Sequence, residues 1–270
     1  QIIQYQYDPR GNLLGRQSSL GAPVAEQFAY DTANRQQGYH NLVANQARTY
    51  AYDALGNKVL DCDGAGANCT GYLYDGPNVV AEYSNATATP ALSATYLFGQ
   101  EIDEQVARID PGTATVHFFL RDALGSTRAI IDQVGAVVKR YEYKAFGELY
   151  SETGSGPANN LLFTGRPLDR TSSRYDFRTR TYDPAEGRFL QPDPLYQGLI
   201  LAQCPSCWQH PLELRSVMPL YTYVGNNPAT YNDPTGEQWW FWHPWWWAYG
   251  IWYYRPYGWW GNWWWWPWQF

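Results

Sequence analysis

Aromatic residues alternate with polar ones in short segments that recur along the first half of the chain. The segments YQYDPRGNLL, FAYDTANRQ, YAYDALGNKVL and YLYDGPNVV each place an aromatic residue, a spacer, a tyrosine and an aspartate ahead of turn-forming residues. Their aspartates follow one another at steps of 23, 22 and 22 residues: Asp8, Asp31, Asp53 and Asp75. HFFLRDALGSTRAII adds Asp122 about two periods later, and YEYKAFGEL follows with Lys144 in the aspartate position.

Each repeat predicts one β-hairpin. Side chains on a strand alternate between its two faces, so aromatics two positions apart share one face. The Asp, Gly and Asn residues supply the side-chain hydrogen bonds and positive φ angles of a hairpin turn. One hairpin cannot bury its aromatic face alone, so we expect the hairpins to stack into a spiralling antiparallel sheet over residues 1–150. An ordinary β-sandwich is the alternative, which the regular step disfavours. The predicted fold class is all-β.

Composition and charge narrow the class of protein. The 270 residues include 23 Tyr and 24 Gly, and the mean hydropathy is −0.51, which suits strands and tight turns. The net charge of −6 argues against a nucleic-acid partner, because such partners require a basic face. No apolar run reaches the roughly 18 residues of a membrane-spanning helix. The first residues contain neither a start methionine nor a signal peptide, so we expect a processed or excised piece of a longer chain.

Four cysteines occur in two pairs, Cys62 with Cys69 and Cys204 with Cys207. Two disulfides in an oxidising compartment and one four-thiolate zinc site are the competing interpretations. Six residues separate the members of the first pair, which is wider than the spacing of zinc knuckles. The spacing therefore favours disulfides, with free thiols as a further alternative.

Three longer segments follow in order: LRDALGSTRAIIDQVGAVVKRYEYKAFGE, FTGRPLDRTSSRYDFRTRTYDPAEGRFLQPDP and LYTYVGNNPATYNDPTGE. With the repeats, they closely resemble the YD-repeat or rearrangement-hotspot (Rhs) family, which includes the toxin-complex C components and the teneurin shells. The resemblance covers about residues 1–237. It implies a hollow β-shell of stacked hairpins, closed at one end by an Rhs-associated core plug, here residues 151–237. About six repeats are too few for a complete shell, so we expect a partial one.

The resemblance also implies a cleavage site. In the family, the core releases a variable C-terminal segment by self-cleavage at a DPxGL sequence, using paired aspartates. Asp233 and Gly236 in NDPTGE match that sequence, and Asp193 in QPDP matches the upstream aspartate. Asp183 and Arg188 in TYDPAEGRF match the run before it. Two adjacent carboxylates cannot both ionise readily, so one would serve as base and the other as acid.

The match at this site is incomplete. Glu237 stands where the family has leucine, Gly198 falls later than the family's spacing, and LILAQCPSCWQHPLELRSVMP separates the two DP motifs. The simpler interpretation is that these Asp-Pro pairs begin turns. Conventional enzyme motifs such as GxSxG, HExxH or a phosphate loop do not occur, and the four histidines lack metal-ligand spacing. We therefore expect no cofactor and no metal, and a structural protein in which autoproteolysis is an alternative.

The tail, residues 238–270, is dominated by aromatic residues. It has 14 Trp, 4 Tyr and 2 Phe, with Arg255 as its single formal charge. The contact residues predicted in it are Trp239, Trp240, Trp245, Trp246, Trp263, Trp264, Trp265 and Trp266. Exposed, such a surface would promote aggregation, so we expect burial inside the shell or docking onto another copy. Contact with carbohydrate or a membrane interface is the remaining alternative.

These observations predict a non-enzymatic shell fragment that encapsulates its own C-terminal segment, secreted or at the cell surface. A filament or sheath subunit that polymerises through the tail is the second hypothesis. An autoprocessing aspartyl site at Asp193 and Asp233, assisted by Arg188, is the third.

Overall fold

The computed structural model describes residues 2–21, 23–85, 87–194, 220–237 and 240–241. Within these residues the chain forms a 14-stranded antiparallel sheet in which every strand pairs with its sequence neighbours. The strands are β1 (Ile2–Tyr7), β2 (Leu13–Leu20), β3 (Ala25–Tyr30), β4 (Gln36–Asn41), β5 (Gln46–Tyr52), β6 (Lys58–Asp63), β7 (Cys69–Asp75), β8 (Asn78–Ser84), β9 (Ala91–Phe98), β10 (Gln105–Asp110), β11 (Thr115–Arg121), β12 (Thr127–Ile131), β13 (Val137–Tyr143) and β14 (Leu149–Gly154). The predicted fold class is confirmed.

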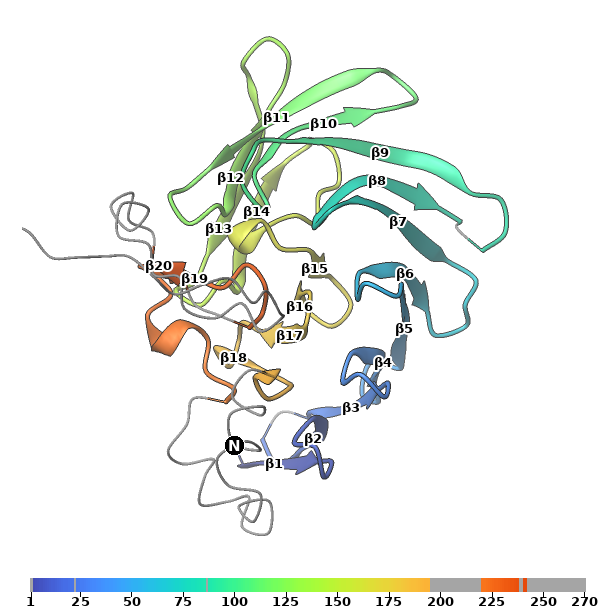
Figure 1. Cartoon of the computed structure of the whole chain (residues 1–270), viewed down its shortest axis with the longest axis vertical. Coiled ribbons are helices and arrows are strands. Elements are labelled where there is room, and N and C mark those ends of the chain that lie inside the picture. The colour runs from blue at the N-terminus through green and yellow to red at the C-terminus, as the bar shows by residue number, and fades with distance from the viewer. Residues whose placement is uncertain (1, 22, 86, 195–219, 238–239, 242–270) are drawn as a thin grey trace, which may run out of the picture.

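The sheet bends into an arc, and the next part of the chain lies on its concave side (Figure 1). We call residues 155–194 and 220–237 the plug. The plug holds a four-stranded antiparallel sheet and short 3₁₀ turns, and β19 pairs with β20 beyond it. These elements are η1 (Phe163–Gly165), β15 (Leu168–Asp169), β16 (Arg174–Phe177), β17 (Arg180–Asp183), β18 (Arg188–Phe189), η3 (Val224–Asn226), β19 (Tyr231–Asn232) and β20 (Trp240–Phe241).

In several hairpins the repeat aspartate closes the turn. In the β5–β6 turn, Oδ1 of Asp53 accepts hydrogen bonds from the backbone N–H groups of Leu55 and Asn57 at 2.9 and 2.8 Å. Gly56 has a φ of 93°, which favours glycine because it has no Cβ. The turns that begin at Asp31 and Asp122 have the same carboxylate-to-backbone bonds. The turn chemistry predicted from the repeat is therefore present.

In four of the repeats the tyrosine joins its hairpin to the one before it. The hydroxyl of Tyr52 donates a hydrogen bond to the carbonyl oxygen of Gln36 at 2.7 Å. The same bond recurs with a sequence separation of 16 or 17 residues from Tyr30 to Leu13, from Tyr74 to Lys58 and from Tyr143 to Thr127. A buried hydroxyl needs a partner, and the regular step supplies the same partner each time. The spacing of the repeat therefore fixes the packing of successive hairpins.

One repeat unit lacks the aspartate and was missed in the sequence pattern. It lies in the gap before Asp122, where Tyr96 and Phe98 stand in the two aromatic positions of β9 and Gly99 follows. The N–H of Gly99 donates to the carbonyl of Glu104 at 2.8 Å, so the backbone closes this turn. Aromatic alternation was the signal that could have located the unit.

The core lies between the concave face of the sheet and the plug. Ile130 and Tyr141 from the sheet pack with Phe163, Tyr182 and Tyr223 from the plug, and all five side chains are at most 4% exposed. The rings of Tyr182 and Tyr223 are centred 4.5 Å apart. Aromatic pairs of this kind add stability beyond the area they bury. The aromatic face of the hairpins is therefore covered by the plug of the same chain.

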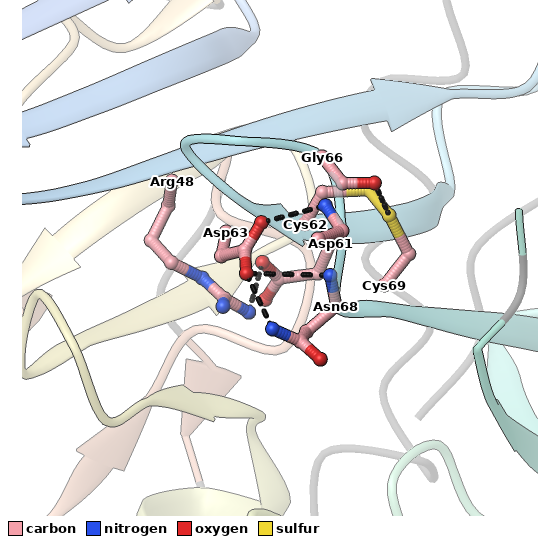
Figure 2. Close-up of a disulfide and its surroundings, with 8 residues drawn as sticks. Arg48, Asp61, Cys62, Asp63, Gly66, Asn68 and Cys69 are labelled. Atoms are coloured by element: carbon pink, nitrogen blue, oxygen red, sulfur yellow. Dashed lines mark hydrogen bonds and ion pairs between the residues drawn. A yellow bond between two sulfur atoms is a disulfide. The ribbon is translucent and has the colours of Figure 1, made fainter.

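Cys62 and Cys69 form a disulfide that crosses from β6 to β7 (Figure 2). The disulfide prediction is confirmed for this pair, whose sulfurs are not available as zinc ligands. Cys204 and Cys207 lie outside the described residues. The helical turns in the described ranges are all too short to form a membrane-crossing helix.

Candidate functional site

Arg180 on β17 brings the two predicted aspartates together. Its Nη2 lies 3.0 Å from Oδ2 of Asp193, which follows β18, and 3.0 Å from Oδ2 of Asp233, which follows β19. Arg180, Asp193 and Asp233 are 4%, 4% and 2% exposed. The guanidinium also lies over the ring of Phe189, 3.6 Å from the ring centre. These three charged residues form what we call the Arg180 cluster.

The Arg180 cluster holds the backbone at the matched DPxG sequence. Oδ1 of Asp233 accepts hydrogen bonds from the N–H groups of Gly236 and Glu237 at 2.9 and 3.1 Å. The carbonyl oxygen of Gly236 accepts from Nε of Arg180 and from Oγ1 of Thr179. Gly236 has a φ of 74°, and a Cβ there would lie 2.2 Å from the carbonyl oxygen of Phe177. Glycine is therefore required at this position.

The other two residues matched to the family lie elsewhere. The side chain of Arg188 is exposed, and the residue contributes backbone pairing to β18. Asp183 is 2% exposed and contacts Nη2 of Arg174 at 3.0 Å and Nη1 of Arg16 at 3.3 Å. Asp183 therefore belongs to a second cluster, and Arg188 does not contribute to the Arg180 cluster in this arrangement.

Sequence reasoning missed Arg180, although a signal for it was present. In RTRTYD, Arg180 and Tyr182 are two positions apart on one strand and so share a face. Tyr182 is fully buried, and an arginine on a buried face requires carboxylate partners. Which carboxylates these are depends on segments more than ten residues away along the chain.

The charges of the Arg180 cluster decide its chemistry. Burial lowers the pKa of Arg180 below its usual value, while Asp193 and Asp233 act in the opposite direction. Burial also raises the pKa of Glu237, and Arg180 opposes that rise. In an aspartic protease, two adjacent carboxylates share a proton. Here one guanidinium nitrogen lies 3.0 Å from a carboxylate oxygen of each aspartate, so the arrangement differs from a proton-sharing pair.

A cavity of about 350 Å³ adjoins this cluster. Its lining includes Glu237 and Pro194 together with Gly56 and Asn57 in the β5–β6 turn. Across the described ranges, no group of three or more His, Cys, Asp or Glu residues is placed to hold a metal ion.

The second cluster joins the plug to the start of the sheet. Nη2 of Arg174 on β16 lies 2.8 Å from Oε2 of Glu26 on β3 and 3.0 Å from Oδ2 of Asp183. Arg174 is 2% exposed, and its guanidinium lies over the rings of Phe28 and Tyr39. Burial acts to raise the pKa of Glu26, but Arg174 and Arg16 hold it below its usual value. The plug is thus attached by buried charge pairs as well as by aromatic packing.

The predicted tail residues lie outside the described part of the chain, apart from Trp240, whose backbone belongs to β20. The contact roles assigned to those tryptophans stay predictions.

An arc of YD hairpins around an attached plug matches one known family. The family model described as the teneurin YD-shell matches residues 1–229. The chain belongs to this family. The predicted YD-repeat, Rhs-type membership is confirmed.

The relatives of this YD-shell chain are much longer proteins. Salivary gland surface protein 1 of Aedes aegypti is 35% identical over 120 residues, which cover 44% of this chain and 3% of the relative. Double-stranded DNA deaminase toxin A of Burkholderia cenocepacia is 26% identical over 220 residues, covering 72% of this chain and 15% of the relative. The crystal structure of TcdB2–TccC3 matches with a TM-score of 0.56 and 18% identity, over 87% of this chain and 13% of that chain. The YD-shell chain thus spans less than a sixth of each.

Proposed function

We propose that this chain is a non-catalytic structural segment of a YD-shell that buries its own C-terminal segment and works outside the cytoplasm. The proposal rests on the hydrogen bonds that fix the backbone of Gly236 and Glu237, the last two residues before the tail. Arg180, Thr179 and Asp233 bind their backbone atoms at the plug. These hydrogen bonds are made on the plug, which lies on the concave side of the sheet (Figure 1).

The extracellular location rests on two supports. The Cys62–Cys69 disulfide is typical of oxidising compartments. One relative is named as a surface protein and another as a toxin, and in both a segment of this type is a small part of a long chain. A partial shell could then be completed by the rest of a longer chain or by other copies.

Tryptophan fluorescence tests the burial of the tail, because 14 of the 15 tryptophans lie in residues 238–270. We expect blue-shifted emission and weak acrylamide quenching in the native protein, and the opposite after unfolding. The protection should not change on dilution, because a shell that buries its own tail needs no second copy. Emission typical of solvent-exposed indole, together with rapid clipping of the tail from an intact body, would overturn the proposal.

Polymerisation through the tail is the second candidate, favoured by the aromatic and nearly uncharged composition of residues 238–270. In that case protection of the tryptophans falls on dilution, and deletion of the tail leaves soluble single particles. A truncated chain that still polymerised would exclude this role. Binding of the tail to vesicles or to carbohydrate would identify the remaining alternative.

Autoproteolysis at the Arg180 cluster is the third candidate, supported by the approach of Asp193 and Asp233 to one guanidinium nitrogen. It requires a chain that ends near Glu237, and Asp233→Asn should abolish the cut. Intact mass measurement decides, because a wild-type chain that stays uncut from expression through storage would rule it out.

A further inference from the structure

A small polar cavity lies between the sheet and the plug. It measures about 20 Å³, room for about one water molecule. Two carboxylates from the sheet, Asp61 on β6 and Glu82 on β8, line it together with two from the plug, Asp169 on β15 and Asp176 on β16. Carboxylates from separate segments therefore meet at the contact by which the plug is attached.

Basic side chains oppose these four acids. Nζ of Lys58 lies 2.8 Å from Oδ2 of Asp176, and Nη2 of Arg48 lies 2.5 Å from Oδ1 of Asp61, as Figure 2 shows for the second pair. Nη2 of Arg166 lies 3.8 Å from Oδ1 of Asp176, and Arg108 acts on Glu82. Four carboxylates thus line a space the size of one water molecule. The ionisable groups facing Asp61 are Arg48 and Tyr50 on β5, Lys58 on β6, Tyr72 and Tyr74 on β7, Glu82 on β8, Asp169 on β15 and Asp176 on β16.

Asp61 is the acid best placed to take up a proton. Burial raises its pKa to about 6, although Lys58 and Arg48 act to lower it. Burial likewise raises the pKa of Glu82. Asp176 differs, because Lys58 and Arg166 outweigh its burial and hold its pKa below the usual value. An acid on the sheet side of the contact therefore takes up the proton, and the pair of Lys58 on the sheet and Asp176 on the plug keeps its charges.

We propose that docking of the plug is linked to protonation of this acid cluster, so that the plug is held more tightly at mildly acidic pH than at neutral pH. When the plug leaves, Asp61 becomes solvated and returns to an ordinary carboxyl group. A carboxyl group whose pKa is higher in the docked state than in the undocked state stabilises docking when it is protonated. This stabilisation is complete below the ordinary pKa of the undocked group, and it is lost as the pH rises through the raised pKa of the docked group. The window therefore runs from about pH 4 to pH 6. The proposal does not depend on where the tail lies.

Hydrogen exchange in β15 and β16 measures plug docking directly. With rates corrected for intrinsic exchange, we expect protection of these strands to be roughly 25-fold greater at pH 4.5 than at pH 7.5. Asp61→Asn should remove most of this difference. Asp75→Asn is the matched control, because Asp75 is exposed on the neighbouring strand β7, and it should behave as wild type.

A second variant keeps the proposal testable if Asp61→Asn does not fold. Asp169 raises the pKa of Asp61 through its charge, so Asp169→Asn should move the midpoint of the pH dependence downward. Wild-type protection that is equal at both pH values, or an unchanged midpoint in Asp169→Asn, would overturn the proposal. Retention of the full pH dependence in Asp61→Asn would overturn it as well.

Discussion

The hydroxyl of Tyr143 donates a hydrogen bond to the backbone carbonyl of Thr127 at 2.6 Å, and so joins one hairpin of the sheet to the previous one. Because Tyr52 makes the equivalent bond to Gln36 four repeats earlier, the bond is a property of the repeat and not of one site. The tyrosine of the YD motif therefore serves the contact between neighbouring hairpins, whereas the aspartate serves the turn within one hairpin.

Tyr52→Phe should destabilise the protein by about 1 kcal/mol, because the ring still packs but the carbonyl of Gln36 loses its partner. Urea unfolding followed by circular dichroism would measure the loss. Tyr150→Phe is the control, because Tyr150 is 71% exposed and its loss of a hydroxyl should change little. Equal effects of the two variants would contradict the assigned role.

Arg174→Ala should lower the free energy of unfolding by about 3–5 kcal/mol, because the buried carboxylates of Glu26 and Asp183 would lose one of the two arginines that pair with them, Arg16 being the other. Arg170→Ala is the comparison, since Arg170 pairs with Glu152 with 42% of its side chain exposed, and it should cost at most about 1 kcal/mol. Thermal and denaturant unfolding of both variants would check the difference. A small effect of Arg174→Ala would mean that water enters the cluster.

Gly236→Ala should be far more destabilising than Gly66→Ala. Both glycines have φ near 70°, so alanine costs about 1–2 kcal/mol at either position from backbone strain. Only at Gly236 does the added Cβ also meet a carbonyl oxygen, at 2.2 Å, while at Gly66 nothing lies within 4 Å. Equal stability losses in the two variants would show that the backbone around Gly236 shifts to accommodate the added Cβ.

Replacement of Cys62 and Cys69 by alanine should cost about 2.5 kcal/mol, because the bond closes a short loop with a sequence separation of 7. Reduction of the wild-type protein should lower stability by a similar amount. If reduction lowers the stability of the double variant further, that additional loss would indicate a second disulfide between Cys204 and Cys207. No effect of reduction on the wild-type protein would contradict a stabilising role for the first disulfide.

The hairpins could be predicted because their determinants are local. Alternating aromatics, one aspartate and a glycine or asparagine within ten residues specify two strands and their turn. The unit at Tyr96 and Phe98 was not identified from the sequence, because Gly99 stands in place of the aspartate and backbone atoms close the turn. The sheet also continues through β14 to Gly154, past the boundary expected at residue 150.

The candidate site could be predicted only in part. Matched motifs pointed to Asp193 and Asp233, and the fold brings both to Arg180. The same motifs pointed to Arg188, whose side chain is exposed. A motif records residues that are adjacent along the chain, whereas charge partners are set by which strands of the plug face one another.

By itself, then, the sequence determined the all-β class, the hairpin repeat, its turns and the family, because each depends on interactions within about 25 residues. Only the tertiary structure decided that the plug lies on the concave side of the arc, that Arg180 and not Arg188 joins the two aspartates, and that Arg174 reaches Glu26 across 148 positions of sequence. The physical reason is burial. A charge removed from water requires a partner, and the folded chain supplies that partner from segments the sequence does not place next to one another.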